Sequence, residues 1–491
     1  MATKRLSDRI GIIFLGNVGT LAISLLFRVL LVRLTTRPEL GSYNQVWLVY
    51  GMISPILLYG VAFSVAYFIP QLSDEERKGF VAQTFLYLLV GSLVFAAGIY
   101  LSAPILSNCF HNAELLPLLG IFMWYPILAL PISFLSGLFI VLDMSKRAAL
   151  ANILYYVSTP VAVLFPLFLG EDLTKAFVAN NLTQFLVLCG GTAYLWWMYR
   201  RTKLVWRKDL VRAQFTYAAP IGLSNILSTI SRQLGGTVVS LFYPVSQFAV
   251  YSVGAFEIPL VRVLSSSMNS VLLPRFVGLY KEARVEEMVR IWHKSIVKLA
   301  VLIMPIFVYL FLIAPQFVVL LYTEKYVGSV TLFRIYLCLY PVRVAQYSML
   351  LYVTGDTKTI LRGSGLYLIL NLVLTLVLVQ VFGLAGPALA DVLATMAMAV
   401  FFLRRVGVLL DLGWRALFPW GTLSRVLGVS MAVGALTYPL VLIPLPNLLT
   451  MIVLGIVYLP GYLLIAFKLG VLERSDIELA RDWVSLKMLV R

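Results

Sequence analysis

Long apolar segments alternate with short polar loops along almost the whole chain. The hydrocarbon core of a bilayer is about 30 Å thick and a helix rises about 1.5 Å per residue, so one crossing needs about 20 apolar residues. Segments of this length predict an all-α polytopic membrane protein with about fourteen transmembrane helices. The predicted spans are 10–34, 43–69, 80–102, 115–141, 148–169, 176–199, 214–242, 247–273, 294–321, 329–353, 360–382, 384–406, 424–443 and 448–468.

The pattern of prolines and tyrosines in the first six spans recurs in the next six. Because each set has an even number of spans, both sets begin on the same side of the membrane and form parallel repeats, as in the halves of some transporters. We therefore expect two pseudo-symmetric six-helix bundles that face each other across a central cavity. The recurring motifs are Pro55 and Pro70 with Pro259 and Pro274, each pair 15 residues apart, and Tyr125-Pro126 with Tyr340-Pro341.

The predicted domain organisation follows from this repeat. Spans thirteen and fourteen have no counterpart, and the tail opens with the capping-box pattern S-D-I-E, which is typical of a helix start. The predicted parts are an N-terminal six-helix bundle (1–199), a basic cytoplasmic linker (200–213), a C-terminal six-helix bundle (214–410), an extra helix pair (411–469) and a cytoplasmic amphipathic tail (470–491).

Composition and charge agree with a multi-pass protein of the cell (cytoplasmic or inner) membrane. The chain is 61% hydrophobic and only 12% charged, whereas soluble domains contain about 25% charged residues. A net charge of +17 would also suit a nucleic-acid-binding protein, but Lys and Arg are concentrated in alternate loops and at both termini. This distribution follows the positive-inside rule, so we expect cytoplasmic termini and no nucleic-acid partner.

The sequence contains no pattern typical of an enzyme. Its three cysteines and two histidines are scattered without metal-ligand or disulfide spacing, and no G-x-x-x-x-G-K-[ST] motif for nucleotide hydrolysis is present. We therefore predict a protein that is not an enzyme, binds no metal and needs no cofactor beyond a coupling ion, H⁺ or Na⁺.

Charged residues inside the predicted spans are the candidate functional groups, because a charge in a membrane is costly and usually marks a substrate or ion path. Two embedded acids cannot neutralise four deep arginines, so the sequence favours a cavity that accepts an anion. The planar guanidinium of arginine binds phosphate or carboxylate oxygens bidentately. The acids are Glu257 and Asp391, and the arginines are Arg28, Arg232, Arg262 and Arg343.

Polar residues share helices with these charges. Arg262, Ser266 and Asn269 lie at i, i+4 and i+7 and therefore on one stripe of span eight, which predicts a substrate-contacting face. For Asn371 and the amides of span six, two roles stay open: lining the cavity or making hydrogen bonds between helices. For Glu257, orienting an arginine and binding a coupling cation both stay open; its five-residue separation from Arg262, about 140° around a helix, does not by itself imply a pair.

Two motifs and the repeat resemble a known group of proteins. The tenth span leaves through Gly355-Asp356-Thr357-Lys358, and F-G-x-x-G-x-A-x-A begins at Phe382 between spans eleven and twelve. Together with the six-plus-six repeat over roughly 10–410, they resemble the Wzx-like polysaccharide flippase branch (PST) of the multidrug/oligosaccharidyl-lipid/polysaccharide (MOP) exporter superfamily. The pattern of length, spans, repeat and loop residues carries this resemblance, since no single motif is diagnostic.

The resemblance implies two bundles that move a polyprenyl-diphosphate-linked oligosaccharide, a cell-surface polysaccharide precursor, from the inner to the outer leaflet by alternating access. It also implies that basic residues in the cavity contact the diphosphate or acidic sugars. The implied partners are membrane lipids, the lipid-linked glycan, a polysaccharide polymerase and glycosyltransferases.

Two other function classes compete with a flippase. A cation-coupled exporter of drugs or small molecules, of the MATE type, needs embedded carboxylates, and here only Glu257 and Asp391 stand against an excess of arginine. An enzyme of lipid-glycan metabolism usually carries a soluble catalytic domain or a large outer loop, for which the short loops leave no room. We predict a flippase and keep the MATE-type exporter as the alternative.

Overall fold

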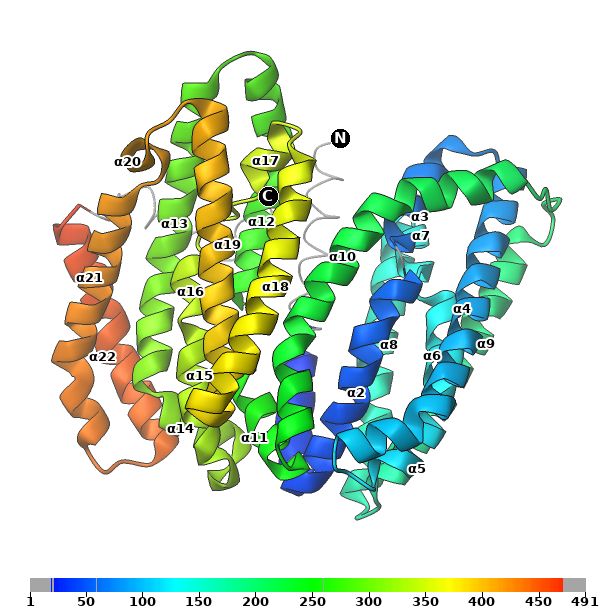
Figure 1. The fold of residues 1–491 in the computed structure, drawn as a ribbon, viewed down its shortest axis with the longest axis horizontal. Helices are drawn as coiled ribbons and strands as arrows, with labels where there is room; N and C mark the ends of the chain where they lie inside the picture. The colour runs from blue at the N-terminus through cyan, green and yellow to red at the C-terminus, as the bar shows by residue number, and fades with distance from the viewer. Residues whose placement is uncertain (1–18, 20–21, 59, 259, 471–491) are drawn as a thin grey trace. The chain divides into compact units, whose positions relative to one another are not determined.

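The computed structural model describes residues 19, 22–58, 60–258 and 260–470. All regular elements in this part of the chain are helices, as the apolar periodicity predicts (Figure 1). The chain forms two compact units, residues 1–249 and 250–490. The amphipathic tail predicted over 470–491 and the beginning of the first span lie outside the described residues, apart from the single residue Gly470.

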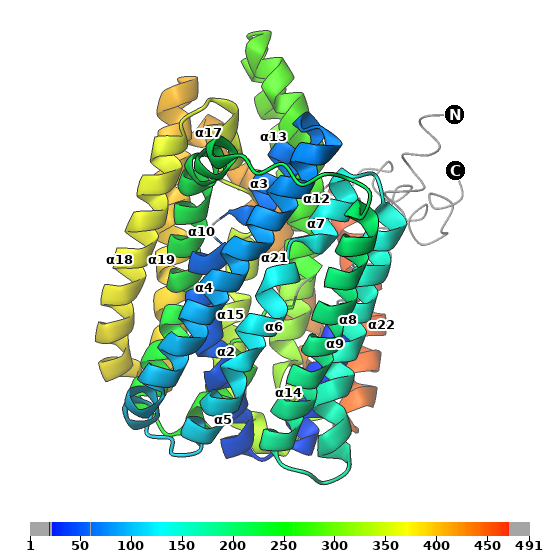
Figure 2. The same ribbon diagram turned by 90° about the vertical axis from the view of Figure 1, so that its right-hand side faces the viewer.

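The described elements of the first unit are all helices, and the long ones, α2, α4, α8, α9 and α10, run roughly parallel or antiparallel to one another (Figure 2). A helix over residues 22–34 comes first. It is followed by α2 (Arg37–Leu58), α3 (Val61–Phe68), η1 (Ile69–Gln71), α4 (Asp74–Cys109), α5 (Leu115–Phe122), α6 (Trp124–Ala129), η2 (Leu130–Ile132), α7 (Leu135–Val141), α8 (Ser145–Phe168), α9 (Leu173–Tyr199) and α10 (Lys208–Phe242).

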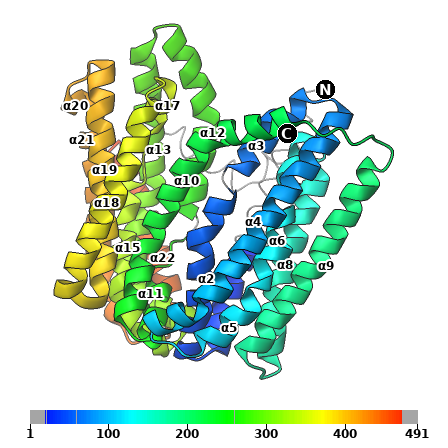
Figure 3. The ribbon, with the colours of Figure 1, turned by 45° about the vertical axis from the view of Figure 1, so that its right-hand side comes forward.

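The second unit has the same kind of organisation, with α18 and α19 packed side by side as a long hairpin (Figures 1 and 3). Helix α11 (Val245–Gly254) crosses the boundary between the units. It is followed by α12 (Leu260–Lys281), α13 (Val285–Leu312), α14 (Ala314–Tyr322), η3 (Glu324–Ser329), α15 (Val330–Leu337), α16 (Leu339–Val342), α17 (Met349–Val353), α18 (Thr357–Phe382), η4 (Gly383–Ala385), α19 (Gly386–Leu410), α20 (Trp414–Leu417), α21 (Trp420–Thr437), η5 (Tyr438–Leu442) and α22 (Asn447–Lys468).

The boundary between the compact units lies after α10, whereas the sequence repeat places a linker before it, at 200–213. Helix α10 packs along α2 and also contacts α3 and α4. Polar contacts fix this packing: the Gln45 amide donates to the Ser240 hydroxyl (2.8 Å), and the Gln214 amide donates to the hydroxyls of Ser64 and Thr84 (3.1 Å each). The predicted division of the chain into two six-helix bundles joined by a linker at 200–213 stays a prediction.

Seven segments of the described chain are long and apolar enough to cross a bilayer. Some other predicted spans, such as 247–273 and 329–353, consist of shorter helices that meet at a break, whereas α9 and α10 are long unbroken helices that carry more polar residues. The count of fourteen spans stays a prediction. The seven segments are Asp74–Cys109, Leu115–Val141, Lys146–Phe168, Val285–Leu312, Thr357–Leu410 (α18 and α19 together), Trp420–Leu442 and Asn447–Lys468.

Side-chain caps fix the start of several long helices. Asp356, in the Gly355-Asp356-Thr357-Lys358 motif, accepts a hydrogen bond from the Thr359 backbone N–H (3.2 Å) and pairs with Arg405 (2.6 Å). The Arg405 guanidinium and the Thr359 hydroxyl lower the pKa of the Asp356 carboxyl. A lowered pKa means that this contribution to stability is present at neutral pH and is lost as the pH falls through the folded-state pKa.

Candidate functional site

The first element of the site is a break in the eighth predicted span. Helix α11 ends at Gly254 and α12 begins at Leu260, so Glu257 lies on non-helical backbone. A Cβ at Gly254 would lie 2.8 Å from the Ser329 carbonyl oxygen, so only glycine permits this close approach of the helix end to the neighbouring chain. Broken helices at membrane depth survive only where protein groups or water satisfy the freed backbone, and in transporters they typically form the binding site.

The second element is a break in the tenth predicted span. Helix α16 ends at Val342 and α17 begins at Met349, so Arg343 opens the break. Side chains satisfy the carbonyl groups that the break frees: Ser265 donates to the Arg343 carbonyl (3.2 Å) and Tyr347 donates to the Val342 carbonyl (2.6 Å). At the first break a side chain satisfies a backbone N–H group instead: the Ile258 N–H donates to the Tyr340 hydroxyl (3.2 Å).

An ion pair joins the two breaks. Arg343 Nη1 contacts Glu257 Oε1, and the side chains are 31% and 21% exposed, respectively. Coulomb attraction is strong in such a partly dry environment, but so is the cost of removing the charges from water. The pair therefore fixes two irregular segments against each other while leaving both charged groups within reach of solvent or a ligand.

A second acidic group lies in the same unit. The Tyr367 hydroxyl of α18 donates to the Asp391 carboxylate of α19. Asp391 also interacts electrostatically with Tyr251 and Tyr336, whose hydroxyls hydrogen-bond each other at 2.7 Å. Asp391 therefore lies within a cluster of tyrosine hydroxyls.

The two acidic groups belong to one polar network. Arg343, which pairs with Glu257, also interacts electrostatically with Tyr367, the partner of Asp391. The structure thus brings together three of the residues predicted from the sequence, Glu257, Arg343 and Asp391, although they are far apart along the chain. We call Glu257, Arg343, Tyr340, Tyr367 and Asp391 the unit-two network.

Other predicted site residues are placed on nearby helices. Asn371 is buried on α18, where its amide oxygen accepts from Thr375 (3.1 Å), and Asn269 is half-buried on α12. Arg262 and Ser266 lie on α12, but their side chains are outside what the structure describes. Their role, like that of Asn269 and Asn371, stays a prediction.

Two predicted arginines belong to the first unit. Arg28 is half-buried and interacts electrostatically with Tyr43 of α2. Arg232 is exposed on α10 and donates to the Thr229 hydroxyl (2.7 Å). Their contribution to a substrate cavity stays a prediction.

The first unit has a neutral counterpart of the unit-two network. Tyr125, which opens the motif matching Tyr340-Pro341, shares a hydrogen bond with Tyr155 (2.9 Å). On α9, Asn181 donates to the Ile121 carbonyl (2.8 Å) and Gln184 donates to Thr159 (3.0 Å), so these two amides connect helices. Both amide atoms of the fully buried Asn180 lack a hydrogen-bond partner among the described residues.

The tyrosines of the unit-two network were not identified as site residues from the sequence. In a sequence, a tyrosine whose hydroxyl has a functional role cannot be distinguished from one that only packs in the core. The difference lies in the hydrogen-bond partner of the hydroxyl group, which the sequence does not show. The Tyr340-Pro341 motif was the available signal. Among the described residues, no group of three or more His, Cys, Asp or Glu side chains could hold a metal ion.

Comparisons with known proteins identify a family and a fold for this chain. A family model described as "Polysaccharide biosynthesis protein" matches residues 6–279. No curated protein matches this chain in sequence. The fold is similar to that of "Lipid II flippase MurJ, inward closed conformation", with a TM-score of 0.74 and 14% identity over 93% of this chain and 98% of that chain.

Two further solved structures share the fold. One is an inward-facing multidrug resistance MATE family transporter of the MOP superfamily, with a TM-score of 0.63 and 14% identity over 80% of this chain and 94% of that chain. The other is a MOP superfamily transporter from Pyrococcus furiosus, with a TM-score of 0.52 and 16% identity over 82% of this chain and 96% of that chain.

These matches confirm the predicted all-α fold class. The family model covers more than half of the chain, and the matched folds cover most of it. The protein is a multi-span membrane protein that belongs to the polysaccharide biosynthesis protein family, and it shares its fold with the solved flippase and MATE transporter structures.

Proposed function

We propose that this protein is a flippase that moves a polyprenyl-diphosphate-linked oligosaccharide, a precursor of a cell-surface polysaccharide, from the inner to the outer leaflet of the cytoplasmic membrane. The family description names polysaccharide biosynthesis, and a flippase of a lipid-linked precursor shares the fold. Glycosyltransferases that build the precursor would act before this step, and a polymerase that consumes it would act after.

The proposal rests mainly on the position of Arg343. Its guanidinium lies where a transmembrane helix is interrupted, and it is held by Glu257 from a second interrupted helix. A diphosphate carries more negative charge and more acceptor oxygens than a single carboxylate, and the guanidinium fork binds phosphate oxygens bidentately. We infer that the diphosphate competes with Glu257 for Arg343 during each transport cycle.

This exchange provides a physical basis for ion coupling. When the diphosphate takes Arg343, Glu257 loses the counter-charge that Arg343 supplies in a partly dry site, so keeping its carboxylate ionised becomes more costly. Uptake of H⁺ or Na⁺ would remove that cost, and Asp391, within its tyrosine cluster, is a second group able to accept a cation. We propose that Glu257 and Asp391 couple substrate movement to one of these ions.

The test is leaflet exchange of a fluorescent polyprenyl-diphosphate sugar by the full chain in vesicles, with Arg343→Ala compared with the wild-type protein. Removing one charge-assisted contact typically costs about 1.5–3 kcal/mol, so we expect exchange to slow by at least roughly tenfold. The matched control is Arg334→Ala, since Arg334 lies on α15 of the same predicted span but stacks on Phe311 and donates to its carbonyl. Equal rates for the Arg343 variant and the wild type would rule out the assigned contact.

A MATE-type exporter of small cationic molecules is the second candidate. Two embedded carboxylates and the shared MATE fold favour it. The same vesicles distinguish the candidates, because an exporter would drive efflux of a cationic dye in an imposed proton or sodium gradient and leave the sugar lipid in its original leaflet.

A further inference from the structure

One end of the α8–α9 hairpin carries alternating guanidinium and aromatic groups. Arg147 Nη1 donates to the Tyr194 hydroxyl (2.6 Å), and Arg147 Cζ lies 5.7 Å from the centre of the Tyr194 ring. The Tyr194 and Trp197 rings are 5.8 Å apart, and Arg200 Cζ lies 5.8 Å from the centre of the Trp197 ring. We call Arg147, Tyr194, Trp197 and Arg200 the Arg–aromatic ladder.

Helix geometry explains how the ladder forms. Positions 194, 197 and 200 are three apart, so their side chains share one face at the end of α9. Helices α8 and α9 pack side by side, and the first turn of α8, which contains Arg147, lies beside the last turn of α9 (Figure 2). The Phe139 ring packs edge-on against Tyr194 at 5.3 Å and holds it from the other side.

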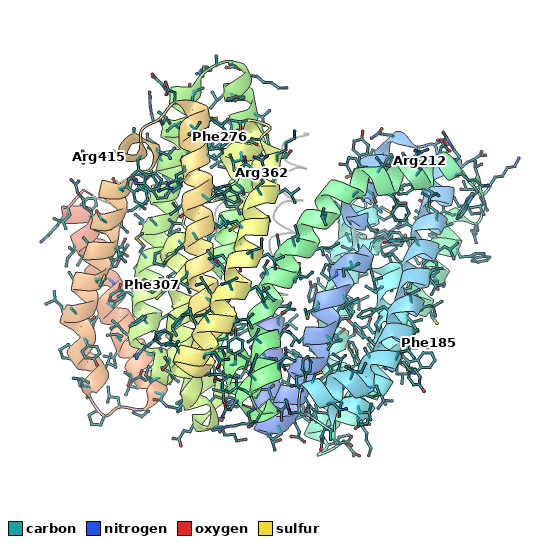
Figure 4. All side chains as sticks on the ribbon, viewed as in Figure 1. Phe185, Arg212, Phe276, Phe307, Arg362 and Arg415 are labelled. Atoms are coloured by element: carbon teal, nitrogen blue, oxygen red, sulfur yellow. The ribbon has the colours of Figure 1, made fainter. Side chains whose placement is uncertain are left out.

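The surface next to the ladder is apolar and exposed. Trp196 is 72% exposed, and Phe185 projects from the same hairpin (Figure 4). In a multi-span membrane protein such a surface faces lipid tails, while tryptophans mark the level of the headgroups. The ladder lies at the end of the hairpin that the positive-inside rule assigns to the cytoplasm, so it faces inner-leaflet headgroups. Other exposed apolar residues of this surface are Leu150, Leu154, Leu182 and Leu186.

The two arginines of the ladder lack the carboxylate partner that some other arginines on the same predicted side have. Arg77, Arg207, Arg284 and Arg405 each form an ion pair with a carboxylate, whereas Arg147 and Arg200 form none among the described residues. Two further cations, Lys146 and Arg201, are adjacent to them, and Asp143 is the acidic group nearest in sequence to Arg147. The local charge therefore stays positive and is directed at whatever lies in the headgroup layer.

We propose that the Arg–aromatic ladder is a binding site for the headgroup phosphate of an acidic phospholipid in the inner leaflet. The rings hold each guanidinium by cation–π attraction and leave N–H groups available for phosphate oxygens. The acyl chains of the bound lipid lie against the exposed apolar surface of α8 and α9. This site lies on the lipid-facing surface of the first unit and is independent of the proposed transport function.

Native mass spectrometry of the full chain in uncharged detergent, titrated with dioleoylphosphatidylglycerol, tests the proposal. Because each basic residue at a membrane surface contributes about a fivefold gain in affinity for acidic lipid, the double variant R147A/R200A should bind about thirtyfold more weakly. The matched control is K281A/R284A, which removes two exposed cations from the same predicted side. If affinity depends on the ladder rather than on the net charge of the protein, the control should stay within about twofold of the wild type.

The proposal would be overturned by equal binding of R147A/R200A and the wild type, by equal binding of dioleoylphosphatidylcholine, or by displacement of the lipid by free glycerol phosphate. The last would assign the site to a soluble phosphate. Displacement by a polyprenyl diphosphate at an equal concentration would assign it to the transported substrate and likewise contradict a phospholipid site. The variant R147K/R200K keeps the charge but loses the planar fork, so its binding should lie between that of the wild type and R147A/R200A.

Discussion

The ion pair between Glu257 and Arg343 should be energetically coupled, and a double-mutant cycle measures this coupling. The single changes are Glu257→Gln and Arg343→Gln, and the cycle is completed by the double variant. Each single change removes the counter-charge that one residue of the pair supplies to the other, in a site where the side chains are only 31% and 21% exposed. The double variant removes both charges of the pair.

The burial of the pair sets the expected magnitude. Exposed ion pairs contribute about 0.2–1 kcal/mol, whereas breaking a fully buried one by removing a single partner costs about 3–5 kcal/mol. For a pair of intermediate exposure we expect each single change to cost about 2 kcal/mol of the free energy of unfolding. The double variant should also cost about 2 kcal/mol rather than the roughly 4 kcal/mol of additive effects.

Thermal unfolding of the four proteins in one detergent, followed by tryptophan fluorescence, supplies the cycle. Each single variant should unfold roughly 2–4 °C below the wild type, with the double variant close to the single ones. Additive shifts would refute the reasoning, because they would show that the two charges do not stabilise each other. In the transport assay, Glu257→Gln should bind the diphosphate probe more tightly than the wild type, since the probe then no longer competes with the Glu257 carboxylate for Arg343.

Three further changes test how the fold supports the site. Tyr340→Phe removes the hydroxyl that accepts a hydrogen bond from the Ile258 N–H. An N–H group that loses its partner away from water costs about 1–3 kcal/mol, so the unfolding temperature should fall. An unchanged unfolding temperature would show that this hydrogen bond does not contribute to stability. Gly79→Ala places a Cβ 1.9 Å from a backbone carbonyl oxygen of the linker and should destabilise the protein. The control Gly98→Ala, in the same helix, places a Cβ in open space and should raise the free energy of unfolding by about 0.5–1 kcal/mol. Equal effects of the two changes on stability would contradict the packing of Gly79 against the linker. Asn180→Leu removes a buried amide without a protein partner and should raise the unfolding temperature, and a lower temperature would indicate that the amide is satisfied by bound water.

The sequence predicted where the membrane helices lie because apolar length and charge placement are set by the bilayer rather than by tertiary contacts. The sequence predicted the eighth span as one segment, 247–273, whereas the structure has a break in it between Gly254 and Leu260. The extent of the break depends on the Tyr340 hydroxyl, which accepts from the Ile258 N–H and comes from a different span. Local sequence carries no information about such a partner.

The charged residues of the site were identified one by one, but their pairing was not. Spacing along one helix left a pair of Glu257 with Arg262 undecided, and that pair stays undecided because the Arg262 side chain lies outside the described part of the structure. The structure does pair Glu257 with Arg343, from a different span. Pairing across helices depends on how two broken spans cross. The same limitation applies to the boundary between the compact units, because contacts such as that of Gln45 with Ser240 place α10 in the first unit.

Leaflet exchange of two labelled lipids by the wild-type chain in vesicles tests the proposed function most directly. One lipid carries a sugar on a polyprenyl diphosphate, and the other carries the same sugar on the same chain through a neutral linkage. If the guanidinium of Arg343 recognises the diphosphate, the first lipid reaches the opposite leaflet and the second does not. Equal exchange of both lipids, or no exchange of either together with gradient-driven efflux of a cationic dye, would contradict the account.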